Sequence, residues 1–180
     1  MEAEILLWIQ NCVRADWLTP LVKCITYLGN AGFIWILLSL MLLLIPRQRR
    51  LGCMCASALV FDLLSVNLLV KNLFARTRPY EVIEGLTNLI GKQSDFSFPS
   101  GHTAASFAVA TVLVMRAPKK LSIPAAVLAV MISLSRLYVG VHYPTDVLGG
   151  VFIGILCGVA AVYFVEWLEK KIAKKREQTE

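Results

Sequence analysis

The most regular feature of this 180-residue chain is a series of long apolar segments separated by short polar connections. A helix needs about 20 apolar residues to cross the hydrocarbon core of a bilayer. On this basis the pattern predicts five membrane spans, which cover residues 18–45, 51–70, 102–115, 121–135 and 144–168. The first span is interrupted by a glycine-containing stretch at 29–32, so it is either one kinked helix or a half-helix followed by a shorter span.

The first 16 residues follow a different pattern, in which apolar and polar side chains separate onto two faces of a helix. The apolar face carries Ile5, Leu6, Ile9, Cys12 and Val13. Together with two nearby tryptophans, this pattern is typical of a helix that lies flat at the membrane surface. We therefore expect an interfacial amphipathic helix over residues 1–16 and a membrane domain over residues 17–168. A sixth span would have to come from residues 1–30.

The composition excludes a water-soluble domain. The chain is 57% hydrophobic and its mean hydropathy is +0.67, and a soluble fold of this size could not bury that much apolar surface. The fold class that we predict is an all-α, polytopic membrane helical bundle. None of the five cysteines is spaced with a histidine as a metal site would require, so we interpret them as small apolar residues in or near the helices.

The distribution of basic residues predicts how the bundle is oriented. The net charge is +6, and Lys and Arg gather after residue 45, after residue 115 and in the tail 169–180. Cytoplasmic connections carry an excess of Lys and Arg, so these three regions are predicted to face the cytoplasm of a multi-pass cell-membrane protein. The loops 71–98 and 136–143 would then share the opposite, extracytoplasmic side.

Basic residues on that outer side go against the charge bias, among them Lys71, Arg76, Arg78 and Arg136. One explanation is a fringe of basic side chains at helix ends that reach toward water. Because unpaired cations beside a bilayer are costly, we favour a bound anion as their partner. Asp62, inside the second span, has two interpretations, which are structural pairing with another helix and a functional role.

A histidine and an aspartate lie close together at the start of the last span. Pro144 favours the first position of a helix, which would place Asp146 in the first turn, within reach of His142. An imidazole held by a carboxylate is a standard way to make a nucleophile or a base, although structural pairs of these residues are more common. Arg136, six residues before His142, carries a planar fork that suits phosphate.

A second histidine opens the third span. Ser100 is the expected N-cap, and Gly101 and His102 begin the helix. Such a start is common by itself, but exposed N–H groups at a helix N-terminus also bind phosphate. The three stretches together place two histidines, an aspartate, a serine and several cations on one side of the membrane, which packing alone does not explain.

These residues resemble the signature of a known family. The stretches Lys71-x6-Arg78-Pro79, Pro99-Ser100-Gly101-His102 and Ser135-Arg136-x5-His142-x3-Asp146 are similar, in order and at every specified position, to the three-part signature of the type 2 phosphatidic acid phosphatase (PAP2) superfamily. That superfamily includes bacterial lipid phosphatases and vanadium-dependent haloperoxidases. Its members usually have six transmembrane helices, one more than the five spans predicted here.

The resemblance implies a role for each matched residue. His142 would attack phosphorus and form a phosphohistidine, Asp146 would hold its other ring nitrogen, and His102 would protonate the leaving oxygen and then help to activate water. The phosphoryl oxygens would be bound by Lys71, Arg78, Ser100, Gly101 and Arg136. Because cations supply the positive charge, neither a metal nor another cofactor is expected. No firm role follows for Arg76 or Ser135.

The predicted function is hydrolysis of a phosphate or diphosphate monoester of a membrane lipid at the outer face of the membrane. Phosphatidic acid, phosphatidylglycerol phosphate and undecaprenyl diphosphate all stay open as substrates. Membrane lipids are the expected partners, nucleic acid is not, and the oligomeric state is not indicated. The alternatives are an anion or lipid-phosphate transporter or binding protein and a vanadate-dependent haloperoxidase.

The length of the third span predicts the depth of the site. The 14 steps from His102 to Arg116 correspond to about 21 Å at ~1.5 Å per residue, whereas the hydrocarbon core is about 30 Å thick. With Arg116 at the cytoplasmic interface, His102 would lie well below the outer surface. We therefore expect a recessed site that is reached sideways from the lipid as well as from water.

Overall fold

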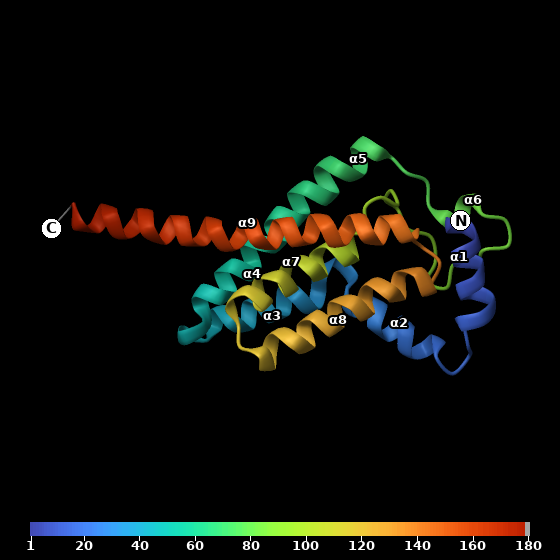
Figure 1. Cartoon of the computed structure of the whole chain (residues 1–180), viewed down its shortest axis with the longest axis horizontal. Helices are drawn as coiled ribbons and strands as arrows, with labels where there is room; N and C mark the ends of the chain where they lie inside the picture. Colours follow the sequence, from blue (N-terminus) through green and yellow to red (C-terminus); the bar gives the residue numbers. More distant parts are fainter. Residues whose placement is uncertain (179–180) are drawn as a thin grey trace.

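The computed structural model describes residues 1–178, and helices make up all the regular structure of this part of the chain (Figure 1). The α-helices in chain order are α1 (Glu2–Trp8), α2 (Thr19–Leu28), α3 (Phe33–Leu44), α4 (Arg49–Asp62), α5 (Lys71–Phe74), α6 (Pro79–Val82), α7 (Gly101–Arg116), α8 (Lys119–Tyr138) and α9 (Pro144–Glu177). A π-helical segment extends α1 over Ile9–Val13, and a second one joins α4 to α5 over Leu63–Val70. Single 3₁₀ turns cover Asn30–Gly32 and Pro46–Gln48. The last two residues of the predicted tail lie outside the described residues.

Helix α7 forms the centre of the bundle and packs against α9, α8 and α4. Small residues allow this close packing, as is common between membrane helices. A Cβ atom added to Gly154 would lie 2.4 Å from the carbonyl oxygen of Ala104, and one added to Gly158 would lie 2.5 Å from that of Ala108. The glycines of α9 therefore let its backbone approach that of α7, and the two helices form the core that supports the residues at their N-terminal ends.

The predicted interruption of the first span is a break between two helices. Helices α2 and α3 are bent by 49° relative to one another at the intervening turn, where Ala31 and Gly32 both adopt left-handed backbone conformations. The break packs against the start of α7, because a Cβ atom added to Gly29 would lie only 2.9 Å from Cδ2 of His102. The break thus brings Asn30, the polar residue of the turn, next to a histidine that the sequence singles out.

The five predicted spans are matched only in part. Helices occupy all five predicted places, but within residues 1–178 three helical stretches are long and apolar enough to cross a membrane, namely Pro46–Val82, α8 and α9. The bent pair of α2 and α3 would make a fourth span. Helix α7 has 16 residues, or about 24 Å at ~1.5 Å per residue, which is shorter than the hydrocarbon core. Many of the residues of α7 are buried among its neighbours.

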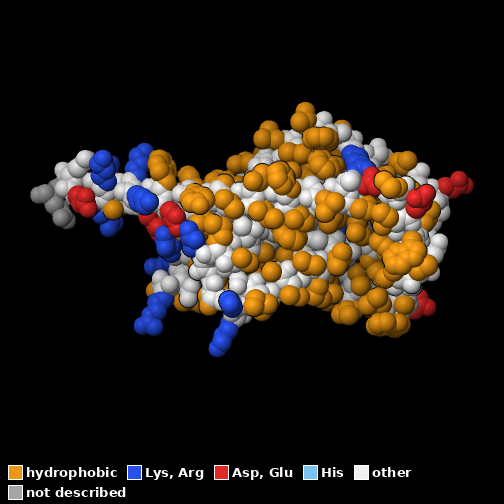
Figure 2. All heavy atoms as spheres, viewed as in Figure 1, with side chains coloured by type: hydrophobic (Ala, Val, Ile, Leu, Met, Phe, Trp, Pro, Cys, Tyr) orange, Lys and Arg blue, Asp and Glu red, His pale blue; other side chains and the backbone are white. Residues whose placement is uncertain are grey.

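The surface separates into an apolar middle and charged ends (Figure 2). At one end, Arg50 of α4 and Arg116 of α7 both contact Glu166 of α9, and Arg50 also pairs with Glu169. The three predicted cytoplasmic regions therefore begin at the same end of the bundle. The α8–α9 connection and α6 lie at the opposite end (Figure 1).

The N-terminal helix crosses that opposite end (Figure 1). Leu6 is its buried residue, whereas Ile5 and Trp8 are exposed. Polar contacts attach the segment to the bundle, since Nε of Arg14 donates to the carbonyl oxygen of Tyr138 at 2.8 Å and Nε2 of Gln10 donates to that of Gly85 at 2.9 Å. Of the expected apolar face, Leu6 therefore packs against the protein, whereas Ile5 points away from it.

Candidate active site

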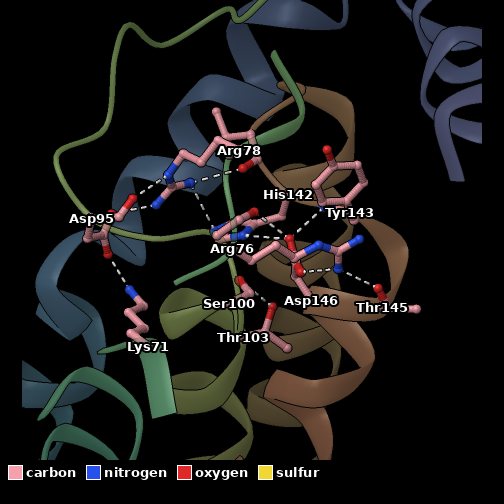
Figure 3. Close-up of polar contacts among 12 residues, drawn as sticks. Lys71, Arg76, Arg78, Asp95, Ser100, Thr103, His142, Tyr143, Thr145 and Asp146 are labelled. Carbon is pink, nitrogen blue, oxygen red and sulfur yellow. Dashed lines mark hydrogen bonds and ion pairs between the residues drawn. The ribbon is translucent and has the colours of Figure 1, made fainter. Parts of the chain in front are cut away.

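Arg78 lies within a cluster of charged side chains at the end of the bundle that holds α6 (Figure 3). Only 4% of its surface is exposed. Its Nη1 donates to the carbonyl oxygen of Val141 at 2.9 Å and lies 3.4 Å from Nε2 of His142. Its Nε donates to the carbonyl oxygen of Asp95 at 2.9 Å. Backbone oxygens from two loops therefore fix this guanidinium group against the histidine ring.

One carboxylate joins Arg78 to the second cation of the cluster. The two side-chain oxygens of Asp95 accept hydrogen bonds from Nη2 of Arg78 and from Nζ of Lys71, which is also buried (Figure 3). Partial burial alone would raise the pKa of Asp95, but the hydrogen bonds and charges of Lys71 and Arg78 lower it to about 2. Asp95 is therefore an ionised partner that sequence reasoning missed, because nothing in its spacing distinguishes it from other loop acids.

His142 is buried between Arg78 and Asp146, with one ring nitrogen toward each. Nε2 faces Arg78, and Nδ1 lies 3.5 Å from Oδ2 of Asp146, at the long limit of a hydrogen bond. The tight connection before it requires Gly140, which has a φ of +78°. Burial lowers the pKa of His142 to about 4, helped by the charges of Arg136 and Arg78 and opposed by Asp146. The ring is therefore neutral near pH 7.

Asp146 is completely buried and is held at both oxygens (Figure 3). Oδ1 accepts a hydrogen bond from Nη1 of Arg76 at 2.6 Å, and Oδ2 accepts from Oγ of Ser97 at 2.5 Å. Oδ2 also accepts from the backbone N–H of Tyr143 at 2.8 Å, which caps the first turn of α9. Arg76, for which no firm role followed from the sequence, therefore helps to hold Asp146 in position. Ser97 is a further partner of Asp146 that the sequence did not indicate.

Arg76 is shared between Asp146 and the N-terminal helix. Its Nη2 donates to Oε2 of Glu2 at 2.7 Å, and its guanidinium lies 3.9 Å from the ring centre of Tyr143. Glu2 also accepts a hydrogen bond from Oγ1 of Thr145 at 2.6 Å. Two carboxylates therefore balance the charge of Arg76, in contrast to Lys71 and Arg78, which share a single one.

The start of α7 brings three predicted residues to the same cluster. Ser100 is buried, its N–H donates to the carbonyl oxygen of Asp146 at 3.0 Å, and its hydroxyl accepts a hydrogen bond from Thr103 at 3.1 Å. A Cβ atom added to Gly101 would lie 3.4 Å from Nζ of Lys71. The absence of a side chain at position 101 therefore leaves space between the helix N-terminus and the lysine.

His102 contacts the break between α2 and α3. Its Nε2 lies 2.9 Å from Oδ1 of Asn30, which can accept a hydrogen bond from an N–H at that nitrogen. Asn30 is a functional candidate that sequence reasoning treated only as part of a kink. The contact joins residues that are 72 positions apart, so only the fold reveals it.

Arg136 is the most buried cation of the cluster, with 1% of its surface exposed. Its Nη1 donates to Oγ1 of Thr26 at 2.7 Å, whereas its Nε has no hydrogen-bond partner. Among the described residues no carboxylate forms an ion pair with it. The neighbouring Ser135 turns back into its own helix and donates to the carbonyl oxygen of Ile132 at 2.6 Å.

A cavity of about 530 Å³ runs from the cluster into the membrane-facing part of the bundle. At one end it is lined by Lys71, Asp95, Gly101 and His102. It continues between α3 and α4, where most of its lining residues are apolar. Asp62 also lines it, and Oδ1 of this buried carboxylate has no hydrogen-bond partner. A charged cluster and an apolar groove are therefore continuous.

Comparison with known proteins found a family match and several similar proteins. The family model of the PAP2 superfamily matches residues 50–170. Phosphatidylglycerophosphatase B of Bacillus subtilis is 33% identical, over 92% of this chain and 82% of that protein. Undecaprenyl-diphosphatase of Sulfolobus acidocaldarius is also 33% identical, over 68% of this chain and only 59% of that protein. The crystal structure of Aquifex aeolicus LpxE superposes with a TM-score of 0.77 at 28% identity, covering 90% of this chain and 94% of that one.

Proposed function

The chain belongs to the PAP2 superfamily, and from this premise we propose that it removes phosphate from a phosphorylated membrane lipid through a phosphohistidine intermediate. The observation that carries the proposal is the pairing of charges in the cluster. Lys71, Arg78 and Arg136 are three buried cations, and only one carboxylate, that of Asp95, pairs with any of them in the described part of the chain. A dianionic phosphoryl group would supply the missing negative charge.

In the first chemical step, Nε2 of His142 attacks phosphorus and the bond between phosphorus and the lipid oxygen breaks. Oδ2 of Asp146 lies 3.5 Å from Nδ1 of the same ring and would accept a hydrogen bond from it during the reaction, which would keep the lone pair on Nε2. His102 gives a proton to the leaving lipid oxygen. The products of this step are the dephosphorylated lipid and a phosphoryl group bound to His142.

In the second step, water attacks the phosphohistidine. His102 accepts a proton from that water, the bond between phosphorus and Nε2 breaks, and inorganic phosphate leaves. Phosphoryl transfer requires mainly positioning and charge stabilisation from the protein, and here Lys71, Arg78 and Arg136 would bind the equatorial oxygens. Ser100 and the N–H of Gly101 would add two further donors. These cations provide the charge that a metal provides elsewhere, so the proposed reaction requires none.

The cavity supports a lipid as the carrier of the phosphate. Its apolar part between α3 and α4 would hold hydrocarbon next to the cluster, which a water-soluble phosphate ester does not need. The names of the relatives offer two classes, a polyprenyl diphosphate and phosphatidylglycerol phosphate. We therefore propose these two classes as substrates, together with phosphatidic acid.

We further propose that the cluster faces the extracytoplasmic side of the cell membrane. The basic end formed around Arg50 and Arg116 would be cytoplasmic, and the short helix α7 would place His102 below the outer surface. Five spans result when the bent pair of α2 and α3 crosses once and the buried α7 is counted. The N-terminal helix would then lie at the outer interface, with Ile5 and Trp8 toward the lipid.

Phosphate release from a panel of lipid phosphates, in detergent with EDTA, tests the proposal. The native protein should release phosphate and the His142→Ala variant should not. Equal release by both proteins would remove His142 as the nucleophile, and loss of activity with EDTA would contradict the metal-free reaction. Protein-dependent transport without any phosphate release would favour the alternative of a transporter.

A further inference from the structure

We propose that Asp95 is a positioning residue that occupies the phosphoryl site of the free enzyme and is displaced whenever a phosphoryl group binds. This inference rests on the proposed function, because it takes Lys71 and Arg78 to be phosphate ligands. The carboxylate would hold both cations in place between turnovers. It would also compete with inorganic phosphate, and so promote release of the product.

The contacts of Asp95 are those expected of an anion in the phosphate position. One of its oxygens accepts from Lys71 and the other from Arg78, so it uses two donors that a phosphoryl group would use (Figure 3). Carboxylates and phosphates both bind such donors through pairs of oxygens. Asp95 also lines the same cavity as Gly101 and His102. A phosphoryl group that takes the same N–H groups would therefore have to displace the carboxylate.

The surroundings of Asp95 would allow it to leave. Its side chain is 47% exposed, whereas those of Lys71 and Arg78 are 7% and 4% exposed. In the described structure its side-chain oxygens bond only to these two cations. Asp146 provides the contrast, because Arg76, Ser97 and a backbone N–H hold it inside the protein. Rotation of Asp95 into water would thus leave no buried carboxylate unpaired.

Displacement of Asp95 by a phosphoryl group changes the charge balance around the three cations. With Asp95 in place, three cations face one negative charge, and after exchange for a dianionic phosphoryl group they face two. Asp95 therefore lowers the net gain from binding any phosphate, because the incoming anion has to replace an existing ion pair. Removal of its charge should strengthen binding of the product more than it changes the chemistry on His142, which Asp95 does not contact.

The variant Asp95→Asn tests this inference, since it keeps the shape and removes the charge. The measurement is the inhibition constant of inorganic phosphate during lipid phosphate hydrolysis, together with kcat and KM. We expect the inhibition constant to fall by about tenfold, on the order of one partly screened charge interaction, and KM to fall with it. The matched control is Glu84→Gln, which removes a charge from an exposed residue of the same loop and should change neither constant by more than about twofold.

Phosphate binding in a His142→Ala background gives a second readout that does not require turnover. Phosphate should raise the Tm of the Asp95→Asn, His142→Ala protein more than that of the His142→Ala protein. Unchanged or weaker phosphate binding on loss of Asp95, in a protein whose native form hydrolyses lipid phosphates, would overturn the inference alone. The absence of both hydrolysis and phosphate binding in the native protein would overturn the proposed function as well.

Discussion

The two ends of the bundle are both rich in arginine, but they use it differently. At the basic end, Arg50 and Arg116 have side chains that are 55% and 33% exposed, and both pair with glutamates of α9. At the other end, Arg78 and Arg136 are 4% and 1% exposed. The two ends therefore do not differ in containing arginine. They differ in how deeply the arginine side chains are buried and in how many carboxylates pair with them.

This difference has an energetic meaning. Exposed ion pairs contribute only about 0–1 kcal/mol, because water already solvates the separate charges. A buried cation costs several kcal/mol unless an anion compensates it. Arg136 has no carboxylate partner in the described chain, and the proposed phosphoryl group would supply the missing anion. At the basic end, in contrast, glutamates of α9 already pair with the arginines.

The largest effect should follow removal of the unpaired cation. Arg136→Leu should lower kcat/KM by roughly 10²–10³, because one donor to the transition state is lost. The matched change at the basic end, Arg116→Leu, should leave kcat/KM within about twofold. Steady-state kinetics on one lipid phosphate compares them, and similar losses in both variants would show that the two ends do not differ in the way described.

A smaller effect is expected for Arg76, which acts through Asp146. Arg76→Gln should reduce kcat by roughly ten- to a hundredfold with little change in KM, since the imidazole of His142 loses its orientation rather than its substrate contact. Arg76→Lys should recover part of the loss. The same reduction should be absent when Asp146→Asn is already present. Additive losses in the double variant would mean that Arg76 acts on the substrate directly.

The pH dependence should report the burial of His142. Its pKa is lowered to about 4, so the ring should stay neutral from pH 7 down to about pH 5. An ordinary histidine, with a pKa of about 6.5, is already protonated at pH 5. NMR of the imidazole carbons of the free protein, with His142→Gln for assignment, measures this directly. Protonation near pH 6.5 would contradict it. The unfolded state binds this proton more strongly, so the free energy of unfolding should decrease as the pH falls from 6.5 toward 4.

The smallest effect is expected at the basic end. Arg50→Gln removes the ion pairs of this largely exposed arginine with Glu166 and Glu169, and the free energy of unfolding should change by no more than about 0.5–1 kcal/mol. Reversible denaturation in detergent checks this value. A loss of several kcal/mol would show that the charge network on α9 holds the bundle together.

The sequence predicts best those parts of the site whose residues lie close together along the chain. The spacing of His142 and Asp146 follows from a single helix start, and the structure indeed places them side by side. The partners Asn30, Ser97 and Asp95 were not found, because each comes from a segment that only the fold brings to the cluster. No local pattern marks an asparagine at a kink or one acid among several in a loop.

The same limit applies to the membrane spans. Helices occur where the apolar pattern predicts them, but hydropathy does not indicate which of them reach across the bilayer. Helix α7 has 16 residues and is covered by α4, α8 and α9, an arrangement that only the fold reveals. The break at Gly29–Gly32 was visible as two glycines, yet its contact with His102 depends on packing against α7.

The most direct test of the central claim is to trap the phosphorylated enzyme. The native protein would be mixed with a lipid carrying a radioactive phosphate and quenched within milliseconds at alkaline pH, where phosphohistidine survives, and the labelled peptide would then be identified. We expect label on His142 in the native protein and none in His142→Ala. Hydrolysis without any label on His142, or label on another residue, would contradict the assignment of this end of the bundle as a phosphoryl-transfer site.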